Sequence, residues 1–273
     1  TDSSINMTYV SFIEGKVPVL LISLILPNFD IVSDDDIKYD NEELKDSLVR
    51  DKISLEESIS NAYLVSYNYL NKDLKINSTT YYVTYISGDA KTDLKIGDEI
   101  ISVDGETFTP NIASEYLSKK SVGENVTIKV KNNDKYYERN ASLIESEGKT
   151  LIGISFAKVN KYDDVLEYKH KNSESGPSGG AMLTIALINE LSDEKLFGDK
   201  KVCGTGTISE DGSIGEIGGV KYKILGASKN KCDYFITPKE NYEEALKVKN
   251  KNNLKIEVVE AENISSLIEK LSS

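Results

Sequence analysis

The sequence predicts an α+β protein with a separate β-rich domain in its middle. Its 273 residues fit about two domains of ordinary size, and 39% hydrophobic residues are enough to form a core. Short strands and tight turns dominate residues 78–157, whereas helical periodicity and glycine-rich loops dominate the flanking segments. We therefore expect a β-rich domain over 78–157, between an N-terminal part over 1–77 and a C-terminal part over 158–273.

The composition argues against several kinds of partner. A net charge of -12 and no dense Lys/Arg stripe disfavour nucleic acid. One histidine and the two distant cysteines, Cys203 and Cys232, do not form a zinc-binding pattern. Two buried thiols are favoured over a disulfide. The acidic run from Asp34 to Asp46 lacks the spacing of a calcium loop, so a solvated connection is expected. We expect neither a metal nor a cofactor.

The N-terminal part predicts two strands and a helix. Residues Met7 to Lys16 and Val17 to Leu26 read as strands around a turn at Glu14-Gly15. The second run is about half the length of a membrane-spanning helix, so it reads as a buried strand. A capping box at Ser54 predicts the start of a helix there. Its expected apolar face is Leu55, Ile59, Ala62, Tyr63 and Leu70.

The middle of the chain predicts a small β-rich domain with one helix. Thr109 is the expected cap of that helix and Pro110 its first residue. Turn residues, including Asp104-Gly105, separate the strands. The expected strands are Tyr81 to Ile86, Ile100 to Val103, Val126 to Val130 and Tyr136 to Leu143, and the expected apolar face of the helix is Ile112, Tyr116 and Leu117.

Two motifs in this domain carry a family resemblance. The segment Leu94 to Gly105, followed by a helix and then Val122 to Val130, resembles bacterial PDZ domains. This resemblance implies that a peptide adds as an extra strand to a sheet edge. The carboxylate-binding loop of that family is Gly-rich, and the corresponding Asn77 to Thr80 is not. A regulatory or spacing role is therefore an alternative to peptide capture.

The strongest chemical signal lies around Ser178. Pro177 stiffens the approach, and Gly179 and Gly180 remove side chains beside the serine, at the start of an apolar helix. Backbone N–H groups at such a helix start can stabilise an oxyanion in acyl transfer. Taken alone, the string is more often an ordinary turn and helix cap.

A serine nucleophile needs a base within hydrogen-bond reach. The single histidine, His170, stands on an expected strand shortly before Ser178, where a surface or packing role is favoured. A buried lysine is the other choice. Lowering its pKa from about 10.4 toward 7 or 8 takes about 3 to 5 kcal/mol, which desolvation can supply.

Three motifs together resemble the proteolytic domain of Lon peptidases. They are Ser175 to Met182, Gly204 to Ala227 and Asp233 to Asn241, in the order found in that family. The resemblance implies a ribosomal-protein-S5-like α/β fold. It also implies that the β-rich domain is inserted into the peptidase domain, because the opening segment resembles the first strands and helix of the same fold.

The same resemblance implies a Ser-Lys dyad. Ser178 corresponds to the nucleophile and Lys223 to the base, with Thr205 orienting the lysine by a hydrogen bond. Lys221 is two residues away, but on a helix it would point to a different face. The implied oxyanion donors are the backbones of Gly179 and Gly180.

The departures from the family are small side chains and one missing motif. Many Lon enzymes have Asp at the position of Ser175 and Ala at that of Gly179; neither change blocks the dyad. No Gly-x-x-x-x-Gly-Lys-Ser/Thr motif occurs, so an ATP-driven unfolding engine is not expected.

These observations predict an ATP-independent serine endopeptidase that cleaves flexible peptides or unfolded protein outside the cytoplasm. The resemblance implies an N-terminal membrane anchor preceding Thr1, and a homo-oligomer is left open. The alternative is a catalytically inactive PDZ scaffold that binds peptides.

Overall fold

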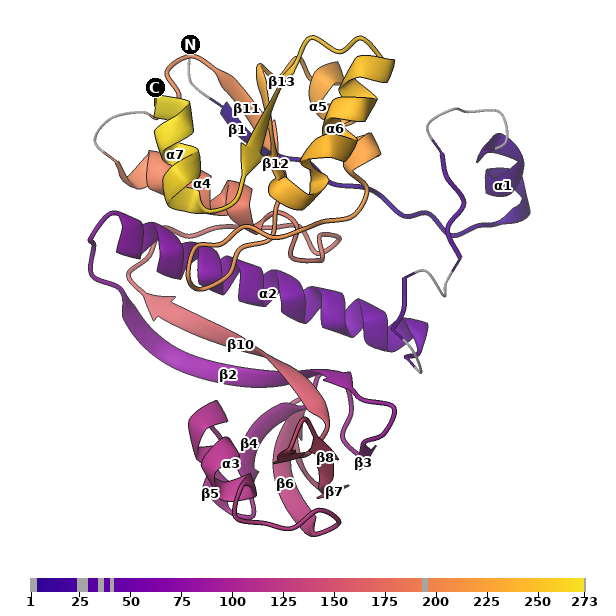
Figure 1. Cartoon of the computed structure of the whole chain (residues 1–273), viewed down its shortest axis with the longest axis vertical. Helices are drawn as coiled ribbons and strands as arrows, with labels where there is room; N and C mark the ends of the chain where they lie inside the picture. The colour runs from indigo at the N-terminus through magenta and orange to yellow at the C-terminus, as the bar shows by residue number, and fades with distance from the viewer. Residues whose placement is uncertain (1–3, 24–28, 34–36, 40–41, 193–195, 273) are drawn as a thin grey trace. The chain divides into compact units, whose positions relative to one another are not determined.

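The computed structural model describes residues 4–23, 29–33, 37–39, 42–192 and 196–272. The chain divides into two compact units, each assembled from segments that are distant in sequence (Figure 1). The first unit contains both ends of the chain, and the second contains its middle. The first consists of 1–33, 58–75 and 162–273, and the second of 34–57 and 76–161.

The first unit is built on a parallel four-stranded sheet in the order β1-β11-β12-β13. Because the strands are parallel, their carboxyl ends meet at one edge, which is where loops of α/β sheets place functional side chains. The strands are β1 (Ser4–Met7), β11 (Lys201–Gly204), β12 (Tyr234–Pro238) and β13 (Glu257–Ala261).

Helices cover both faces of this sheet (Figure 1). Side chains alternate along β12, so Ile236 packs with the helices of one face and Phe235 with those of the other. The Ile236 face carries α4 (Gly180–Leu191) and α7 (Ile264–Ser272), and the Phe235 face carries α5 (Val220–Lys229) and α6 (Lys239–Lys251).

The segment after β1 differs from the prediction of two strands. The chain leaves the sheet at Met7, and a short helix α1 (Val17–Ser23) follows, none of whose residues is buried. Apart from Met7, which ends β1, the strand predictions over Met7 to Lys16 and Val17 to Leu26 are therefore wrong where the structure describes them. Residues 24–26 lie outside the described ranges, as do 34–36 of the acidic run. With no strand beside it, the segment satisfies its backbone hydrogen bonds within a helix.

Helix α2 (Leu44–Tyr69) begins ten residues before the predicted start at Ser54. Ser54 lies inside the helix, so its assignment as a cap is wrong. Buried Ser47, Arg50 and Ile53 recur every three residues and extend the helix face backwards. Ser47 and Arg50 are polar, so a hydrophobicity pattern does not show the helical period of this face. Arg50 can be buried because it pairs with Glu42.

The second unit contains a largely antiparallel sheet in the order β10-β2-β4-β6-β7-β3, with β5 paired to β4. The four predicted strands are confirmed within β2, β4, β6 and β7, except that Leu143 lies just beyond β7. The strands are β2 (Lys75–Ile86), β3 (Lys91–Thr92), β4 (Glu99–Val103), β5 (Glu106–Thr107), β6 (Asn125–Asn132), β7 (Lys135–Ser142) and β10 (Ile154–Asp163), with β8 (Ile144–Ser146) and β9 (Lys149–Leu151) as a separate hairpin.

The helix of the second unit begins where the sequence predicts. In α3 (Pro110–Leu117), the Thr109 hydroxyl accepts a hydrogen bond from the Ile112 N–H, which confirms the cap. Leu117 is buried as expected, but Ile112 is 44% exposed, so its placement on the apolar face is wrong. Ala113 takes the buried position instead.

Cys203 and Cys232 form a disulfide, with their Cα atoms 5.9 Å apart. The preference for two free thiols is therefore wrong. Cys203 lies on β11 and Cys232 follows α5, so the bond joins a strand to the loop after a neighbouring helix. Spacing alone could not show this, because the two residues are brought together only by the fold.

No helix in the described ranges is both long and apolar enough to cross a lipid bilayer.

Candidate active site

Ser178 lies in a tight turn immediately before α4. The Gly180 N–H donates to the Pro177 carbonyl over 3.1 Å, which closes the turn around the serine. The Ser58 hydroxyl, from α2, donates to the same carbonyl over 3.1 Å. Ser178 itself is only partly buried. The turn is thus fixed from two sides while the serine remains accessible to a substrate.

The two glycines after Ser178 allow close packing against the turn. A Cβ on Gly180 would lie 2.3 Å from the Ser58 hydroxyl and 2.4 Å from the Ile208 side chain. A Cβ on Gly179 would lie 2.7 Å from the Met7 sulfur. Met7 therefore gives a physical reason for glycine rather than alanine at position 179.

Thr205 connects the serine turn to the lysine. It follows β11 directly, and its hydroxyl donates to the Ser178 carbonyl over 2.9 Å. The same hydroxyl accepts a hydrogen bond from the Lys223 Nζ over 3.0 Å. The Gly206 N–H also donates to the Ser178 carbonyl, over 2.8 Å. One hydroxyl therefore separates the Lys223 amine from the backbone of Ser178.

Lys223 is a buried amine with no ion-pair partner among the described residues. It lies on the inner face of α5 and is 4% exposed. Burial lowers its pKa from 10.5 to about 8, because an ammonium loses its hydration there. Such an amine is neutral often enough near neutral pH to accept a proton.

The loop before α5 fixes the start of the lysine helix. The Asn241 amide on α6 accepts from the Ile217 N–H over 2.9 Å and donates to the Ile217 carbonyl over 3.0 Å. Gly219 then adopts a positive φ of 73° directly before the first turn of α5. A side chain there would be strained and would meet Val10.

Lys221 has a different environment, as its position on the helix predicts. Its side chain is 41% exposed and lies 3.1 Å from the Asp30 carboxylate. Hydrogen bonds with the Tyr222 hydroxyl and then with Asp30 raise the pKa of Lys221. These contacts favour the charged form, which cannot serve as a base.

His170 is not on a strand, because β10 ends at Asp163. The prediction of an extended strand there is wrong. The imidazole ring of His170 stacks on Tyr168, with 6.3 Å between the ring centroids. The structure thus brings together Ser178, Thr205 and Lys223, and it gives His170 a packing contact instead.

The proposed oxyanion donors differ from each other. The Gly180 N–H is already used by the Pro177 carbonyl, whereas Gly179 is the N-cap of α4. The assignment of both backbones to an oxyanion hole stays a prediction, and Gly179 is the better placed of the two.

Sequence reasoning missed three residues that shape this site. Ser58 and Met7 lie in the opening segment, whose resemblance implied no site residue, and a serine on a helix or a methionine at a strand end is ordinary. Asn241 closes the third quoted motif, so its presence there was a signal. Its role becomes clear only from the two hydrogen bonds to Ile217.

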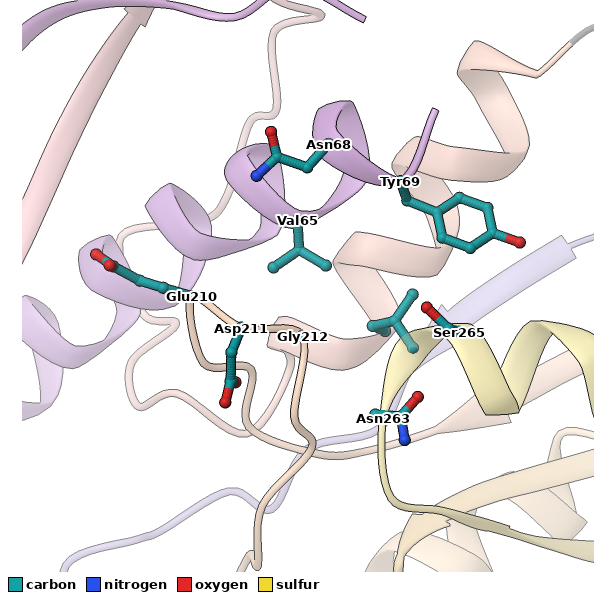
Figure 2. Close-up of a pocket in the computed structure, with 9 residues that line it drawn as sticks. Val65, Asn68, Tyr69, Glu210, Asp211, Gly212, Asn263 and Ser265 are labelled. Carbon is teal, nitrogen blue, oxygen red and sulfur yellow. The ribbon is translucent and has the colours of Figure 1, made fainter. Parts of the chain in front are cut away.

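An open pocket of about 440 Å³ lies elsewhere on the first unit (Figure 2). Asp211 in its wall is held by the Ser213 N–H and hydroxyl. Within the described ranges no group of three His, Cys, Asp or Glu is arranged to hold a metal ion. The pocket lacks the dyad residues; it is lined by Val65, Asn68, Tyr69, Glu210, Asp211, Gly212, Asn263, Ile264 and Ser265.

A protein-family model matches the part of the chain that contains this site. Residues 153–272 match the model of the Lon protease (S16) C-terminal proteolytic domain. Over these residues the chain is of the Lon protease type. The match contains the Ser178 turn, Thr205 and Lys223, which are the residues that the hydrogen bonds connect.

Relatives of the Lon-type domain are similar over about a third to a half of this chain. The peroxisomal Lon protease homolog 2 of Caenorhabditis elegans is 38% identical over 96 residues, which is 35% of this chain. The Lon protease of Campylobacter jejuni is 31% identical over 135 residues, or 46% of this chain. The matched parts span only 12% and 17% of the length of those two relatives.

Two solved PDZ domains are also similar to part of the chain. The PDZ domain of an SdrC-like protein from Listeria monocytogenes is 29% identical, covers 30% of this chain and 92% of its own, and has a TM-score of 0.27. The corresponding domain from Listeria innocua is 32% identical, covers 28% and 92%, and has a TM-score of 0.26.

Proposed function

We propose that this chain is a serine endopeptidase in which Ser178 is the nucleophile and Lys223 the general base. The observation that carries the proposal is the path from the Lys223 amine through the Thr205 hydroxyl to the Ser178 carbonyl, with bonds of 3.0 and 2.9 Å. Within the described ranges Lys223 is buried without an ion pair, and one hydroxyl separates it from the backbone of the partly buried Ser178 turn; a Ser-Lys mechanism requires such an amine near the serine. The proposed substrates are flexible peptides or unfolded protein segments.

Thr205 sets the direction of the hydrogen bonds. Its single O–H proton points to the Ser178 carbonyl, so toward Lys223 it can only accept. One N–H of Lys223 is therefore held by Thr205 in both protonation states of the amine. The lone pair of the neutral amine is left free to face the Ser178 hydroxyl.

A proton moves to and from Lys223 in each half of the cycle. Neutral Lys223 takes the Ser178 proton as the serine oxygen bonds to the scissile carbonyl carbon. The ammonium gives that proton to the leaving amine as the peptide bond breaks. In the second half of the cycle, neutral Lys223 takes a proton from the attacking water and returns it to the Ser178 oxygen as the bond between that oxygen and the acyl carbon breaks. No step uses a nucleotide, so the proposal includes activity without ATP.

The arrangement of domains is part of the proposal. The first unit is assembled from 1–33, 58–75 and 162–273, which supports a PDZ-like domain inserted into an S5-like peptidase domain. From the family resemblance, the proposal also includes a membrane anchor and action outside the cytoplasm.

The test is cleavage of a quenched peptide library by the wild-type chain and by Ser178→Ala, both without ATP. We expect turnover by the wild type and at least a thousandfold loss in the variant, as in other enzymes that lose their nucleophile. Equal cleavage by both proteins, or none by either, would reject the proposal. The second outcome would favour a peptide-binding scaffold without catalysis.

A further inference from the structure

A second threonine lies close to the site and has no assigned role. Thr237 is the penultimate residue of β12, and its side chain is completely buried. Among the described residues, its hydroxyl oxygen has no hydrogen-bond partner. Buried hydroxyl groups are nearly always paired, so an unpaired one calls for an explanation.

Strand register puts Thr237 beside Thr205. Gly204 on β11 pairs with Ile236 on β12. The Thr205 N–H donates to the Ile236 carbonyl over 3.0 Å, which continues the parallel ladder by one residue. Thr205 and Thr237 are therefore neighbours across the two strands, at the carboxyl edge of the sheet.

Both threonine side chains lie on the face of the sheet that α5 covers. Cys203 and Phe235 are two residues earlier on their strands, and both pack with Val220 and Ile224 of α5. Side chains two residues apart on a strand share a face. Thr205 confirms the direction, because its hydroxyl contacts Lys223 of α5. Thr237 therefore points to the same layer as the Lys223 amine.

The chemistry of Lys223 leaves room for a second acceptor. A lysine ammonium has three N–H donors and no acceptor. Thr205 accepts one of them, and its own proton is used by the Ser178 carbonyl. When the amine takes a proton in a buried site, a further acceptor stabilises the new charge.

We propose that Thr237 is a positioning residue whose hydroxyl accepts a hydrogen bond from Lys223 when the lysine carries the proton taken from Ser178. The inference rests on the proposed function. The neutral amine receives the serine proton and becomes an ammonium that both threonines hold. After it gives the proton to the leaving amine, the Thr237 contact is no longer needed, so the hydroxyl is unpaired when the amine is neutral.

The charged side chains nearest in sequence to Lys223 and Thr237 are paired elsewhere, so they do not stabilise the Lys223 ammonium. Lys221 pairs with Asp30, and Lys239, two residues after Thr237, pairs with Glu262; all four side chains are substantially exposed. On α6, the buried Asn241 is engaged with Ile217. The described residues between α5 and the sheet include the apolar Val220, Ile224 and Phe235, and a single hydroxyl is effective in such surroundings.

The first test measures the pKa of Lys223 directly by NMR titration of its side-chain ¹³Cε signal, assigned by its loss in Lys223→Arg. Thr237→Val keeps the shape of the side chain and removes the hydroxyl. We expect it to lower the pKa of Lys223 by about 0.5 to 1 unit, and Thr237→Ser to restore most of that value. Thr184→Val is the matched control, because Thr184 is equally buried but its hydroxyl donates to the Gly180 carbonyl on α4.

The second test measures kcat/KM for a quenched peptide against pH. Thr237→Val should lower the plateau about tenfold and move the acid limb to lower pH, since the ammonium is less stabilised. A purely structural role would lower the plateau and leave the limb in place. An unchanged Lys223 pKa in Thr237→Val would overturn the inference. A shifted pKa in a chain that cleaves no peptide would keep it and reject the proposed peptidase.

Discussion

Burial of the Lys223 amine is the main physical feature of the site at the scale of single residues. The side chain is 4% exposed, has no ion-pair partner in the described ranges, and its pKa falls to about 8 through desolvation. An unpaired buried charge opposes folding, so function and stability make opposite demands on this residue.

Lys223→Met should therefore stabilise the protein. In the unfolded chain the lysine pKa is about 10.4. Below pH 8 the charged lysine therefore destabilises the folded state, relative to the unfolded chain, by about 3 kcal/mol. Between pH 8 and 10.4 the unfolded state binds more protons, and wild-type stability rises with pH. Denaturant unfolding should show Lys223→Met more stable by about 2 to 3 kcal/mol at pH 7, with little difference at pH 10.5. Equal stability of the wild type and Lys223→Met at pH 7 would contradict the desolvation of Lys223.

The same pKa sets the pH dependence of cleavage. Only the neutral amine accepts the serine proton, so kcat/KM should rise with pH through a midpoint near 8 and then level off. A rate profile for the quenched peptide checks this. A midpoint near 6.5 would point to a histidine instead.

Lys221 provides a matched control for the base. Lys223→Ala should remove turnover, by a factor of roughly 10³ or more, because the acceptor of the serine proton is lost. Lys221→Ala should keep most of it, because that side chain is exposed and pairs with Asp30. Steady-state rates of the two variants decide the matter, and the reverse order would move the base to Lys221.

At the scale of elements, the start of α4 depends on the absence of a side chain at position 180. Gly180→Ala would place a methyl 2.3 Å from the Ser58 hydroxyl and 2.4 Å from Ile208, so the turn at Ser178 must shift. We expect a loss of about 2 kcal/mol in stability and a fall of roughly a hundredfold in kcat.

Gly226→Ala on α5 is the control for this change. No atom lies within 4 Å of a Cβ there, and the residue is inside a helix. This variant should gain about 0.5 to 1 kcal/mol in stability. Unfolding curves and peptide turnover for both variants test the packing of the turn. Similar stability and turnover of Gly180→Ala and Gly226→Ala would show that neighbouring atoms do not exclude a side chain at position 180.

The sequence predicted elements best where one local signal determined them. Thr109 and Pro110 mark the start of α3, and buried and exposed side chains alternate along most of β6. The start of α2 was missed, because the buried face of its first half contains Ser47 and Arg50, which a hydrophobicity pattern reads as exposed. The strand over Val17 to Leu26 was wrong, because apolar residues without a partner strand can form a helix.

The sequence predicted the site residues that lie in recognisable motifs. Ser178, Thr205 and Lys223 stand in quoted motifs, and the structure joins them by hydrogen bonds. Ser58 and Met7 could not be found in this way, because they reach the turn from segments more than 100 residues away. Such contacts depend on tertiary packing and leave no local pattern.

At the scale of the whole molecule, the two units correspond to different family resemblances. Residues 162–272 of the Lon-type match lie in the first unit, and the region over 78–157 that resembles PDZ domains lies in the second. The chain contains no phosphate-binding Gly-x-x-x-x-Gly-Lys-Ser/Thr motif. Under the proposed function, cleavage therefore depends on how readily a substrate reaches the dyad in an extended form.

This view predicts a preference for unfolded substrates. Unstructured casein should be cleaved at the same rate with and without ATP, because no step of the mechanism uses a nucleotide. A stably folded protein should resist cleavage under both conditions, and should become a substrate once it is denatured. Gel-based rates measure this, and stimulation by ATP would contradict the expectation.

The most direct measurement is the site of covalent labelling by a serine-reactive fluorophosphonate, read by intact mass and peptide mapping. The account predicts a single adduct on Ser178, absent in Ser178→Ala, strongly reduced in Lys223→Ala and retained in Lys221→Ala. Labelling of a different residue, or equal labelling of Ser178 in the wild type and Lys223→Ala, would contradict activation of this serine by the buried lysine.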